Sequence, residues 1–346
     1  MKRRLRVMLV TSGLGNAQGG IGVVAEMIAE VLYENTDVLI LRHHYEWPRP
    51  VRIADMVLRS AAFALARPDL VIYEHADLAQ LHVTLPYLTR IPFVVFLHGD
   101  EIWEPFGGRR KEALLRADLL LTNSAFSVRK ARVKNPWIPE AKVVWLGVPA
   151  PPPHVAPFSE RGPVALYVGR MAPNDPLKGT DLLLDAWGPI QKALSSSRLF
   201  LVGDGADRAR LRERTRREGL SRVDFLGHIG DAARDALYQS SRAFLFPSQK
   251  EGFGLAAVEA ASFGVPIVGI QGTVLEELFP GGSGTSLAAQ ATGESVAEAA
   301  LKLLADPERA EQEGMAARDR VLSTFLRSHF RDRLRAAMAP LMARLK

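Results

Sequence analysis

Residues 243 to 263 read AFLFPSQKEGFGLAAVEAASF, and they combine a strand, a glycine loop and a helix in one short stretch. The apolar run 243–246 has the length of a buried strand, and helical spacing of apolar residues begins at Leu255. Glycines at 252 and 254 allow the backbone to turn sharply and to approach a ligand closely. The helix directs its positive N-terminal end at that spot. The stretch predicts a βα unit with a cradle for anions and hydroxyls.

Two carboxylates belong to this cradle. Glu251 precedes the glycines, and Glu259 lies eight residues later, two turns into the predicted helix. This spacing allows the two carboxylates to contact different parts of one long ligand. The alternative interpretation is a turn followed by a solvated helix glutamate, and a motif alone does not decide between the two.

The same rhythm of short apolar runs and longer helical patterns extends over the whole chain. It indicates βαβ units with buried parallel sheets, and therefore an α/β fold. Predicted strands in the first half are Arg6–Thr11, Val38–Leu41, Leu70–Tyr73, Phe93–Leu97, Leu119–Thr122 and Val143–Trp145. Those in the second half are Val164–Val168, Leu199–Val202, Val223–Leu226, Ala243–Phe246 and Pro266–Ile270.

A proline-rich segment divides the two halves. Residues 149–163 hold six prolines, a density that prevents both helix and central strand. With 346 residues, the chain also exceeds one ordinary core. We therefore expect two doubly wound domains, 1–155 and 156–319, with the ligand in a cleft outside the carboxyl ends of their strands.

Composition narrows the classes of function. Hydrophobic residues make up 47% and charged residues 24%, and no apolar run approaches the roughly 20 residues of a membrane span. The apolar run after the basic N-terminus is too short for a signal peptide, and cysteine is absent, so we expect a soluble, cytoplasmic protein. The formal charge of +6 is interleaved with 38 acidic residues, which argues against a nucleic-acid partner.

One basic run, from Arg109 to Lys134, departs from this even distribution. Solvated helix faces explain such runs in most cases. The functional alternative is attraction to an anionic lipid surface, worth about 1 kcal/mol per basic residue near the membrane. On that alternative the protein would be peripheral at the inner face of the cell membrane and would favour a lipid-linked acceptor.

Several motifs in order resemble the family 4 retaining glycosyltransferases with the GT-B fold. The stretch from Glu251 to Glu259 resembles the E-x7-E signature of that family, and Gly169-Arg170 with Lys178-Gly179 resembles its donor-phosphate motif. Further matches are Gly203 after a strand, Gly227-His228-Ile229 at the nucleotide base, the glycine loop Gly19–Gly22, and His98 after a strand. The resemblance extends from Val7 to Pro266. One departure is Trp145–Pro149, which replaces a more polar string.

The resemblance implies a role for each matching residue. Glu251 and His98 would be catalytic. Arg170, Lys178, Gly20, Gly254 and Leu255 would bind the donor diphosphate, Gly252 and Phe253 the donor sugar, and Glu259, Gly203, His228 and Ile229 the nucleoside. No D-x-D triplet closes a strand, so neither a metal nor a cofactor is expected.

The resemblance further implies transfer of a hexose, with retention, from a UDP- or GDP-sugar to a lipid-linked, polysaccharide or small-molecule acceptor. The first domain would bind the acceptor, the second would bind the donor, and a last helix at about 320–346 would cross back onto the first. Alternatives are a GT-B sugar-nucleotide epimerase and a non-catalytic regulatory subunit. An NAD-dependent oxidoreductase fits poorly, because Gln18 stands where the fingerprint Gly13-Leu14-Gly15 needs its third glycine.

Overall fold

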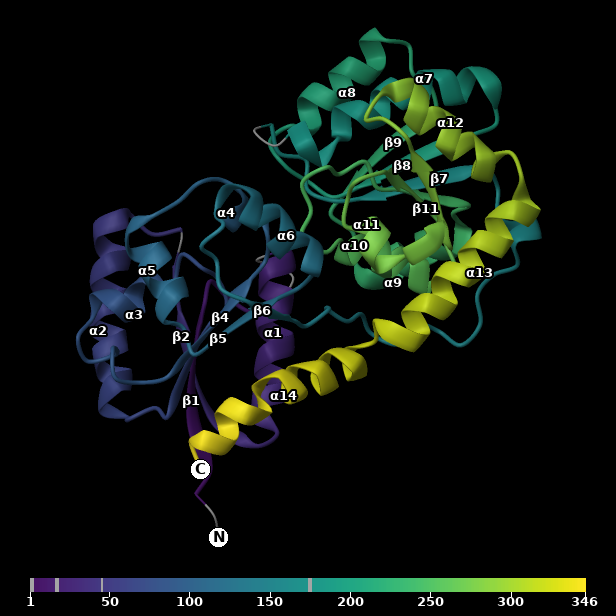
Figure 1. The fold of residues 1–346 in the computed structure, drawn as a ribbon. Coiled ribbons are helices and arrows are strands. Elements are labelled where there is room, and N and C mark those ends of the chain that lie inside the picture. Colours follow the sequence, from purple (N-terminus) through teal and green to yellow (C-terminus); the bar gives the residue numbers. More distant parts are fainter. Residues whose placement is uncertain (1–2, 16–18, 45, 174–175) are drawn as a thin grey trace. The chain divides into compact units, whose positions relative to one another are not determined.

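The computed structural model describes residues 3–15, 19–44, 46–173 and 176–346, which form two compact units (Figure 1). Unit 1 comprises Met1–Gly147 with Arg327–Lys346, and unit 2 comprises Val148–Leu326. Within the described residues, each unit contains one six-stranded sheet in which every strand pair is parallel. The predicted α/β class with two doubly wound sheets is confirmed.

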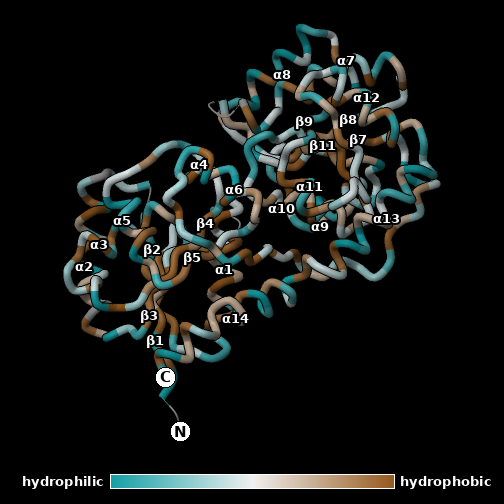
Figure 2. Tube along the Cα trace, viewed as in Figure 1, coloured by the Kyte–Doolittle hydropathy of each residue, from teal (hydrophilic) through white to brown (hydrophobic). Residues whose placement is uncertain are grey.

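The sheet of unit 1 has the strand order β2-β1-β3-β4-β5-β6. Its strands are β1 (Leu5–Thr11), β2 (Thr36–Arg42), β3 (Leu70–Tyr73), β4 (Phe93–Leu97), β5 (Leu119–Thr122) and β6 (Ala141–Val143). β3 and β4 are buried along their whole length, because a parallel sheet is covered on both faces. In Figure 2 the brown, hydrophobic tube follows these inner strands.

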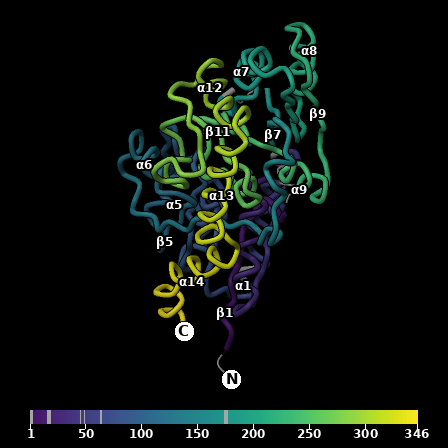
Figure 3. Tube along the Cα trace, turned by 90° about the vertical axis from the view of Figure 1, so that its right-hand side faces the viewer, coloured from purple at the N-terminus to yellow at the C-terminus, as the bar shows by residue number. Residues whose placement is uncertain are grey.

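Helices complete unit 1. They are α1 (Gly19–Tyr33), α2 (Arg49–Leu65), α3 (Gln80–Thr84), α4 (Asp100–Trp103), α5 (Gly108–Arg116), α6 (Ala125–Lys134) and α14 (Arg327–Arg344). Although α14 ends the sequence, it packs beside α1, as Figures 1 and 3 both show. Arg327 of α14 forms an ion pair with Glu30 of α1 at 3.0 Å.

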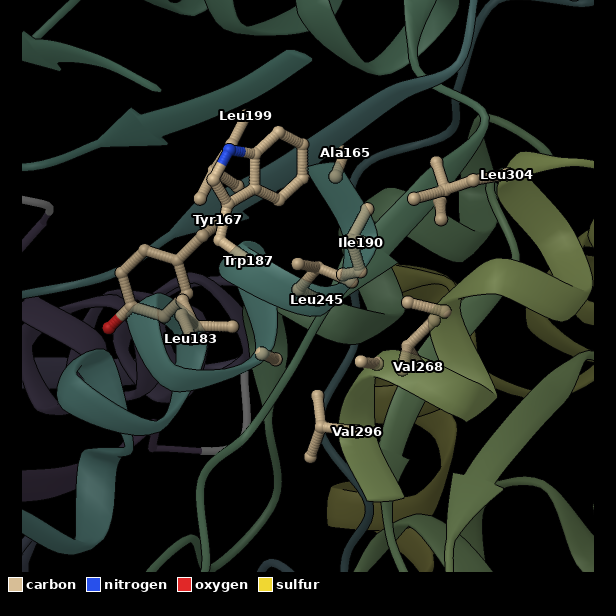
Figure 4. Close-up of a cluster of buried hydrophobic side chains, with 14 of the residues drawn as sticks. Ala165, Tyr167, Leu183, Trp187, Ile190, Leu199, Leu245, Val268, Val296 and Leu304 are labelled. Atoms are coloured by element: carbon tan, nitrogen blue, oxygen red, sulfur yellow. The ribbon is translucent and has the colours of Figure 1, made fainter. Parts of the chain in front are cut away.

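The sheet of unit 2 has the order β12-β11-β10-β7-β8-β9. Its strands are β7 (Val164–Val168), β8 (Arg198–Val202), β9 (Val223–Gly227), β10 (Ala243–Leu245), β11 (Ile267–Ile270) and β12 (Thr285–Ala288). Its core gathers around the buried Trp187, with side chains from β7, β8 and α7 (Thr180–Ala193) pointing toward one another (Figure 4).

The other helical elements of unit 2 are mostly crossovers between strands. They are η2 (Phe158–Glu160), η3 (Pro176–Lys178), α8 (Arg208–Arg217), α9 (Asp231–Ser240), α10 (Leu255–Ser262), α11 (Leu275–Leu278), η4 (Pro280–Gly282), α12 (Gly293–Leu304) and α13 (Pro307–Thr324). No described helix is both long and apolar enough to cross a membrane.

Two sequence expectations about the elements are wrong. The last helix, expected at about 320–346, is in fact the end of α13 followed by α14, because the backbone leaves the helix at Phe325. There Val148 donates its N–H to the carbonyl of Phe325 at 2.8 Å and pairs with Leu326. The strand expected at Val143–Trp145 lies two residues earlier, at β6, where it pairs with β5.

Both sheets reverse their strand order at one point. In unit 1 the chain turns from one side to the other between β1 and β3, and in unit 2 between β7 and β10. Ligands of open α/β sheets bind outside the carboxyl ends of the strands at such a switch point. The expected boundary at residues 155 and 156 falls within 149–157, a segment without helix or strand, and it stays a prediction.

Candidate donor-binding site

An ion pair marks the switch point of unit 2. Lys178, in the connection after β7, donates from Nζ to Oε2 of Glu251, after β10, at 2.7 Å. The side chains are 30% and 26% exposed, so solvent and ligands can reach the pair. The backbone holds the two segments together as well, because Gln249 donates its N–H to the carbonyl of Leu177 at 2.8 Å. Lys178 and Glu251, 73 positions apart in the sequence, are thus in contact where the resemblance places the donor.

Two glycines shape the backbone around this pair. Gly179 (φ +79°) precedes α7, and a Cβ there would lie 2.6 Å from the carbonyl oxygen of Pro247. Gly254 (φ +90°) precedes α10, and a Cβ there would lie 2.9 Å from the ring of Phe246. Only glycine fits such left-handed, crowded positions. Helix α10 then begins at Leu255, where its first-turn N–H groups can receive an anion.

The two residues predicted to contact the donor sugar are buried. Phe253 is 2% exposed, and its ring packs edge-on against Phe325 with centroids 5.8 Å apart. Gly252 beside it is also buried. The side chain of Phe253 is therefore a packing residue, and only the backbone of this pair is left for a sugar hydroxyl.

Arg170, predicted to bind the diphosphate, follows β7 by two residues and is exposed. Among the described residues it has no ion-pair partner. An exposed guanidinium at the carboxyl end of a strand is well suited to a phosphate.

Glu259 lies on α10 and is held by the neighbouring helix α9. The hydroxyl of Tyr238 donates to Oε2 of Glu259 at 3.3 Å, and Nε of Arg234 lies 4.0 Å from the same oxygen. Burial raises the pKa of Glu259, while Arg234 and Tyr238 act in the opposite direction. Sequence reasoning did not find Tyr238 and Arg234, because only the packing of α9 on α10 brings them to the carboxylate.

The three residues predicted at the nucleoside with Glu259 differ in their surroundings. A Cβ at Gly203 (φ +120°) would lie 2.0 Å from the carbonyl oxygen of Gly169, so close backbone packing already requires this glycine. His228, after β9, is exposed and Ile229 is half-buried. The nucleoside role of all three stays a prediction.

His98 lies in unit 1, directly after β4. Its Nε2 is 2.6 Å from the carbonyl oxygen of Glu74, and since a carbonyl only accepts, Nε2 carries the hydrogen. Burial lowers the pKa of His98, which keeps the ring neutral near pH 7 and leaves Nδ1 as an acceptor. Asn123 fixes the backbone by donating to the carbonyl of His98 at 2.8 Å.

Sequence reasoning missed Glu74, the residue after β3. Its carboxylate is fully buried and accepts from the backbone N–H of Ser12 at 2.7 Å and from the hydroxyls of Ser12 and Thr11, each at 2.5 Å. Burial raises its pKa, and these hydrogen bonds oppose the shift. Glu74 therefore fastens the loop after β1 across the switch point of unit 1. The sequence did contain a signal, because Glu74 directly follows a fully apolar strand. A carboxylate buried at such a place needs hydrogen-bond partners.

Gly20 lies in the first turn of α1, and a Cβ there would meet nothing within 4 Å. Neither packing nor a positive φ requires this glycine, in contrast to Gly203. The neighbouring Gln18 of the rejected dinucleotide fingerprint lies outside the described residues. Among the residues that the structure describes, no group of three or more His, Cys, Asp or Glu side chains could hold a metal ion.

Solved structures of other proteins share this architecture. Sucrose-phosphate synthase from Thermosynechococcus elongatus superimposes with a TM-score of 0.79 at 18% identity, covering 98% of this chain and 100% of that one. HepE of Anabaena in complex with UDP and glucose gives a TM-score of 0.75 at 18% identity, covering 97% and 100%. The chain is thus a GT-B protein by fold, as expected.

Sequence comparison specifies the family. The family model described as Glycosyl transferases group 1 matches residues 154–320. A glycogen synthase of Mycobacterium tuberculosis is 29% identical over 275 residues, which cover 75% of this chain but only 66% of that relative. Residues 154–320 therefore match the glycosyl transferases group 1 family, which confirms the resemblance found in the sequence for this segment.

Proposed function

We propose that the chain is a retaining glycosyltransferase that moves a hexose from a UDP- or GDP-sugar to a lipid-linked, polysaccharide or small-molecule acceptor. The observation that carries this proposal is the Lys178–Glu251 ion pair at the switch point of unit 2, next to the glycine-headed helix α10. The ion pair brings together two motifs that both lie in residues 154–320, the segment that the family model matches, at a place that a ligand can reach. HepE, with the same fold, was solved with UDP and glucose, which supports a sugar-nucleotide donor.

The charges suit a diphosphate. A sugar nucleotide has two negative charges, and the departing nucleoside diphosphate gains more as the glycosidic bond breaks. In the proposal Arg170, Lys178 and the first-turn N–H groups of α10 receive this charge. Gly20 belongs to the same proposal, since a glycine that packing does not require leaves room for close approach of the phosphates.

Glu251 then has a positioning and stabilising role. When a diphosphate draws Lys178 away, the carboxylate of Glu251 is freed to accept hydrogen bonds from donor hydroxyls. In the proposed front-face step the bond from the anomeric carbon to the phosphate oxygen breaks while the acceptor oxygen bonds to that carbon. The acceptor proton passes to the departing phosphate. The neutral His98 of unit 1 would accept a hydrogen bond from the donor sugar at Nδ1.

We assign the acceptor to unit 1 and the donor to unit 2, with work at the cytoplasmic face of a membrane when the acceptor is lipid-linked. The nucleoside contacts from Glu259, Gly203, His228 and Ile229 and the sugar contacts from the Gly252–Phe253 backbone are part of the same assignment.

A two-stage experiment tests the proposal. Thermal shift with UDP-, GDP-, ADP- and dTDP-sugars finds the donor, because a ligand at a hundred times its dissociation constant adds about 2.7 kcal/mol of stability. Turnover of that donor is then measured for the native chain and for Glu251→Gln. We expect kcat to fall on the order of a hundredfold with nearly unchanged nucleotide affinity, because the interaction is strongest in the transition state.

Glu298→Gln serves as the matched control, because Glu298 also pairs with a lysine, Lys302 at 3.0 Å, but on the exposed surface of α12. It should leave turnover unchanged. Full turnover by a folded Glu251→Gln variant would remove Glu251 from the reaction. A product in which the sugar is still attached to the nucleotide would indicate an epimerase instead.

A further inference from the structure

Exposed large apolar side chains gather on one helix of unit 1. On α2 they are Val51, Ile53, Val57, Leu58 and Leu65, with exposed fractions from 38% to 85%. Each of the other described helices exposes at most one such residue. Single exposed apolar residues are ordinary, whereas a contiguous group of them indicates an interaction surface.

The helical spacing places these residues on one face of α2. Successive residues of a helix are about 100° apart, so Ile53, Val57, Leu65, Leu58 and Val51 follow one another around less than half of the circumference. The smaller residues Pro50 and Ala54, also exposed, lie between them, and the exposed Ala62 extends the face beyond Val51. Among the described side chains of α2, this face carries no charge. We call it the α2 apolar face.

The opposite side of α2 packs against unit 1. Met56 and Ser60 are 2% and 0% exposed, and the Ser60 hydroxyl lies 2.8 Å from the hydroxyl of Tyr87. The usual surface helix presents its polar side to water. In α2 the side that faces solvent is apolar instead.

Charged residues lie along the margins of the α2 apolar face. Asp55 and Arg59 are half-buried and 3.6 Å apart, and Arg52 is half-buried beside them. Arg67 is exposed just beyond the end of α2, and Trp47, 37% exposed, precedes its start. Arginines therefore outnumber acidic groups at these margins. Helices that lie in a membrane surface combine an apolar face with flanking basic and tryptophan residues in this way.

We propose that the α2 apolar face inserts into the surface of an anionic lipid bilayer, with the marginal arginines at the headgroup phosphates. This deepens the proposed function, since it gives unit 1 a contact with the membrane in which a lipid-linked acceptor would reside. It depends only on α2 and does not require the donor assignment.

The basic run Arg109–Lys134, which the sequence suggested as the membrane contact, is a weaker candidate. Many of its cations have partners within unit 1, as Arg59 of α2 also does, so the exposed apolar side chains decide between the two surfaces. Lys134 pairs with Glu104 at 2.6 Å, Arg110 with Asp77 at 2.9 Å and Arg116 with Glu112 at 2.9 Å, while Lys111 and Lys130 lie over the rings of Trp137 and Trp103. Its exposed large apolar residues are Leu115 and Val133, one on each of two helices.

Sedimentation with lipid vesicles, without any sugar nucleotide, tests the proposal. The vesicles contain equal parts of phosphatidylglycerol and phosphatidylcholine, with phosphatidylcholine alone as the comparison. We expect the native chain to bind the anionic vesicles and Leu58→Glu with Leu65→Glu to lower the partition coefficient at least tenfold. Both positions are exposed, at 71% and 85%, so the fold should tolerate the change.

The matched control is Leu115→Glu with Val133→Glu, which adds the same two charges at residues 51% and 82% exposed on α5 and α6. It should leave vesicle binding unchanged. Equal binding by the native chain and the double variant would overturn the proposal. So would self-association in sedimentation velocity that the double variant abolishes while vesicles retain neither protein, because the face would then join two copies of the chain. Since no nucleotide is present, a failed donor screen leaves the result intact.

Discussion

The two units both use a glutamate to hold the connections at their switch points together, but the two glutamates differ in burial. In each unit, a glutamate follows the strand on the far side of the switch point, β3 in unit 1 and β10 in unit 2. Its side chain contacts the end of the first strand of the unit, β1 or β7, or the connection that follows it. In unit 1 this residue is Glu74, fully buried and saturated by Thr11 and Ser12. In unit 2 it is Glu251, about a quarter exposed and paired with Lys178. The first arrangement fastens a loop, whereas the second can exchange its partner for a ligand.

The residues around the two glutamates differ in charge and exposure as well. The connections of unit 2 pack through glycine backbone, with Gly203 against Gly169, and leave Arg170 exposed. Unit 1 instead has buried, neutral side chains such as His98. Charged groups that solvent can reach suit a diphosphate, and preset neutral groups suit sugar hydroxyls. We therefore expect the charged contacts to the donor diphosphate to come mainly from unit 2, whereas His98 of unit 1 offers a neutral acceptor to a sugar hydroxyl.

The largest expected effect concerns the glycine packing of unit 2. Gly203→Ala places a Cβ 2.0 Å from a carbonyl oxygen at φ +120°, so we expect a loss above about 3 kcal/mol in the free energy of unfolding. Gly219→Ala is the control, since φ is +65° there but no atom lies within 4 Å. It should cost about 1 to 2 kcal/mol. Urea unfolding measures both, and equal losses would show that Gly203 does not support the packing.

The neutral histidines of unit 1 should make stability depend on pH. Burial lowers the pKa of His82 to about 4 from 6.5. The unfolded chain therefore binds this proton first, and stability falls as the pH drops from about 7 towards 4, by about 2 to 3 kcal/mol.

Urea unfolding as a function of pH checks this linkage. His82→Gln should flatten the slope between pH 7 and 4, whereas the exposed His228→Gln in unit 2 should leave it as in the native chain. An identical slope in all three proteins would contradict a neutral, buried His82.

Removing the carboxylate of unit 1 should have a somewhat smaller effect. Glu74→Gln keeps the size of the side chain but presents an amide N–H₂ where donors already point, so we expect a loss of about 2 kcal/mol in stability. Glu46→Gln, at a glutamate 54% exposed, should cost less than about 0.5 kcal/mol. Calorimetric titration of the Glu74→Gln variant with the correct nucleotide should give the native affinity. A large loss of affinity there would mean that unit 1 contributes more to nucleotide binding than the contact at Gly20.

The smallest effect is expected at Glu259. If this carboxylate binds ribose hydroxyls, Glu259→Ala should weaken nucleotide binding about tenfold, the low end of a lost charge-assisted hydrogen bond. Tyr238→Phe should weaken it less, because Arg234 still faces the carboxylate. Titration calorimetry gives both values. Native affinity in Glu259→Ala would place the ribose elsewhere in unit 2.

Local sequence patterns predicted most strands of the two sheets, but not the side-chain contacts between neighbouring strands and helices. The strands from β7 to β11 follow apolar runs, whereas β12 reads Thr-Ser-Leu-Ala and lacks such a run. Glu251 and Lys178 were found because glycine motifs surround them. Glu74 and Tyr238 were not, because their importance depends on which strands and helices become neighbours, and spacing along one chain does not contain that information. Phe253 was assigned to the sugar from its place in a motif, although packing against Phe325 buries its ring.

The break between α13 and α14 has a consequence for how the protein is made. Unit 2 is one continuous segment, Val148–Leu326, whose two ends are joined by the hydrogen bond from Val148 to Phe325. Unit 1 needs residues from both sides of it, because α14 packs on α1. Domains generally fold as units while the chain emerges at about 5–20 residues per second. The unit that is translated first therefore completes its structure last, and until α14 arrives the surface of α1 that it covers is open to chaperones.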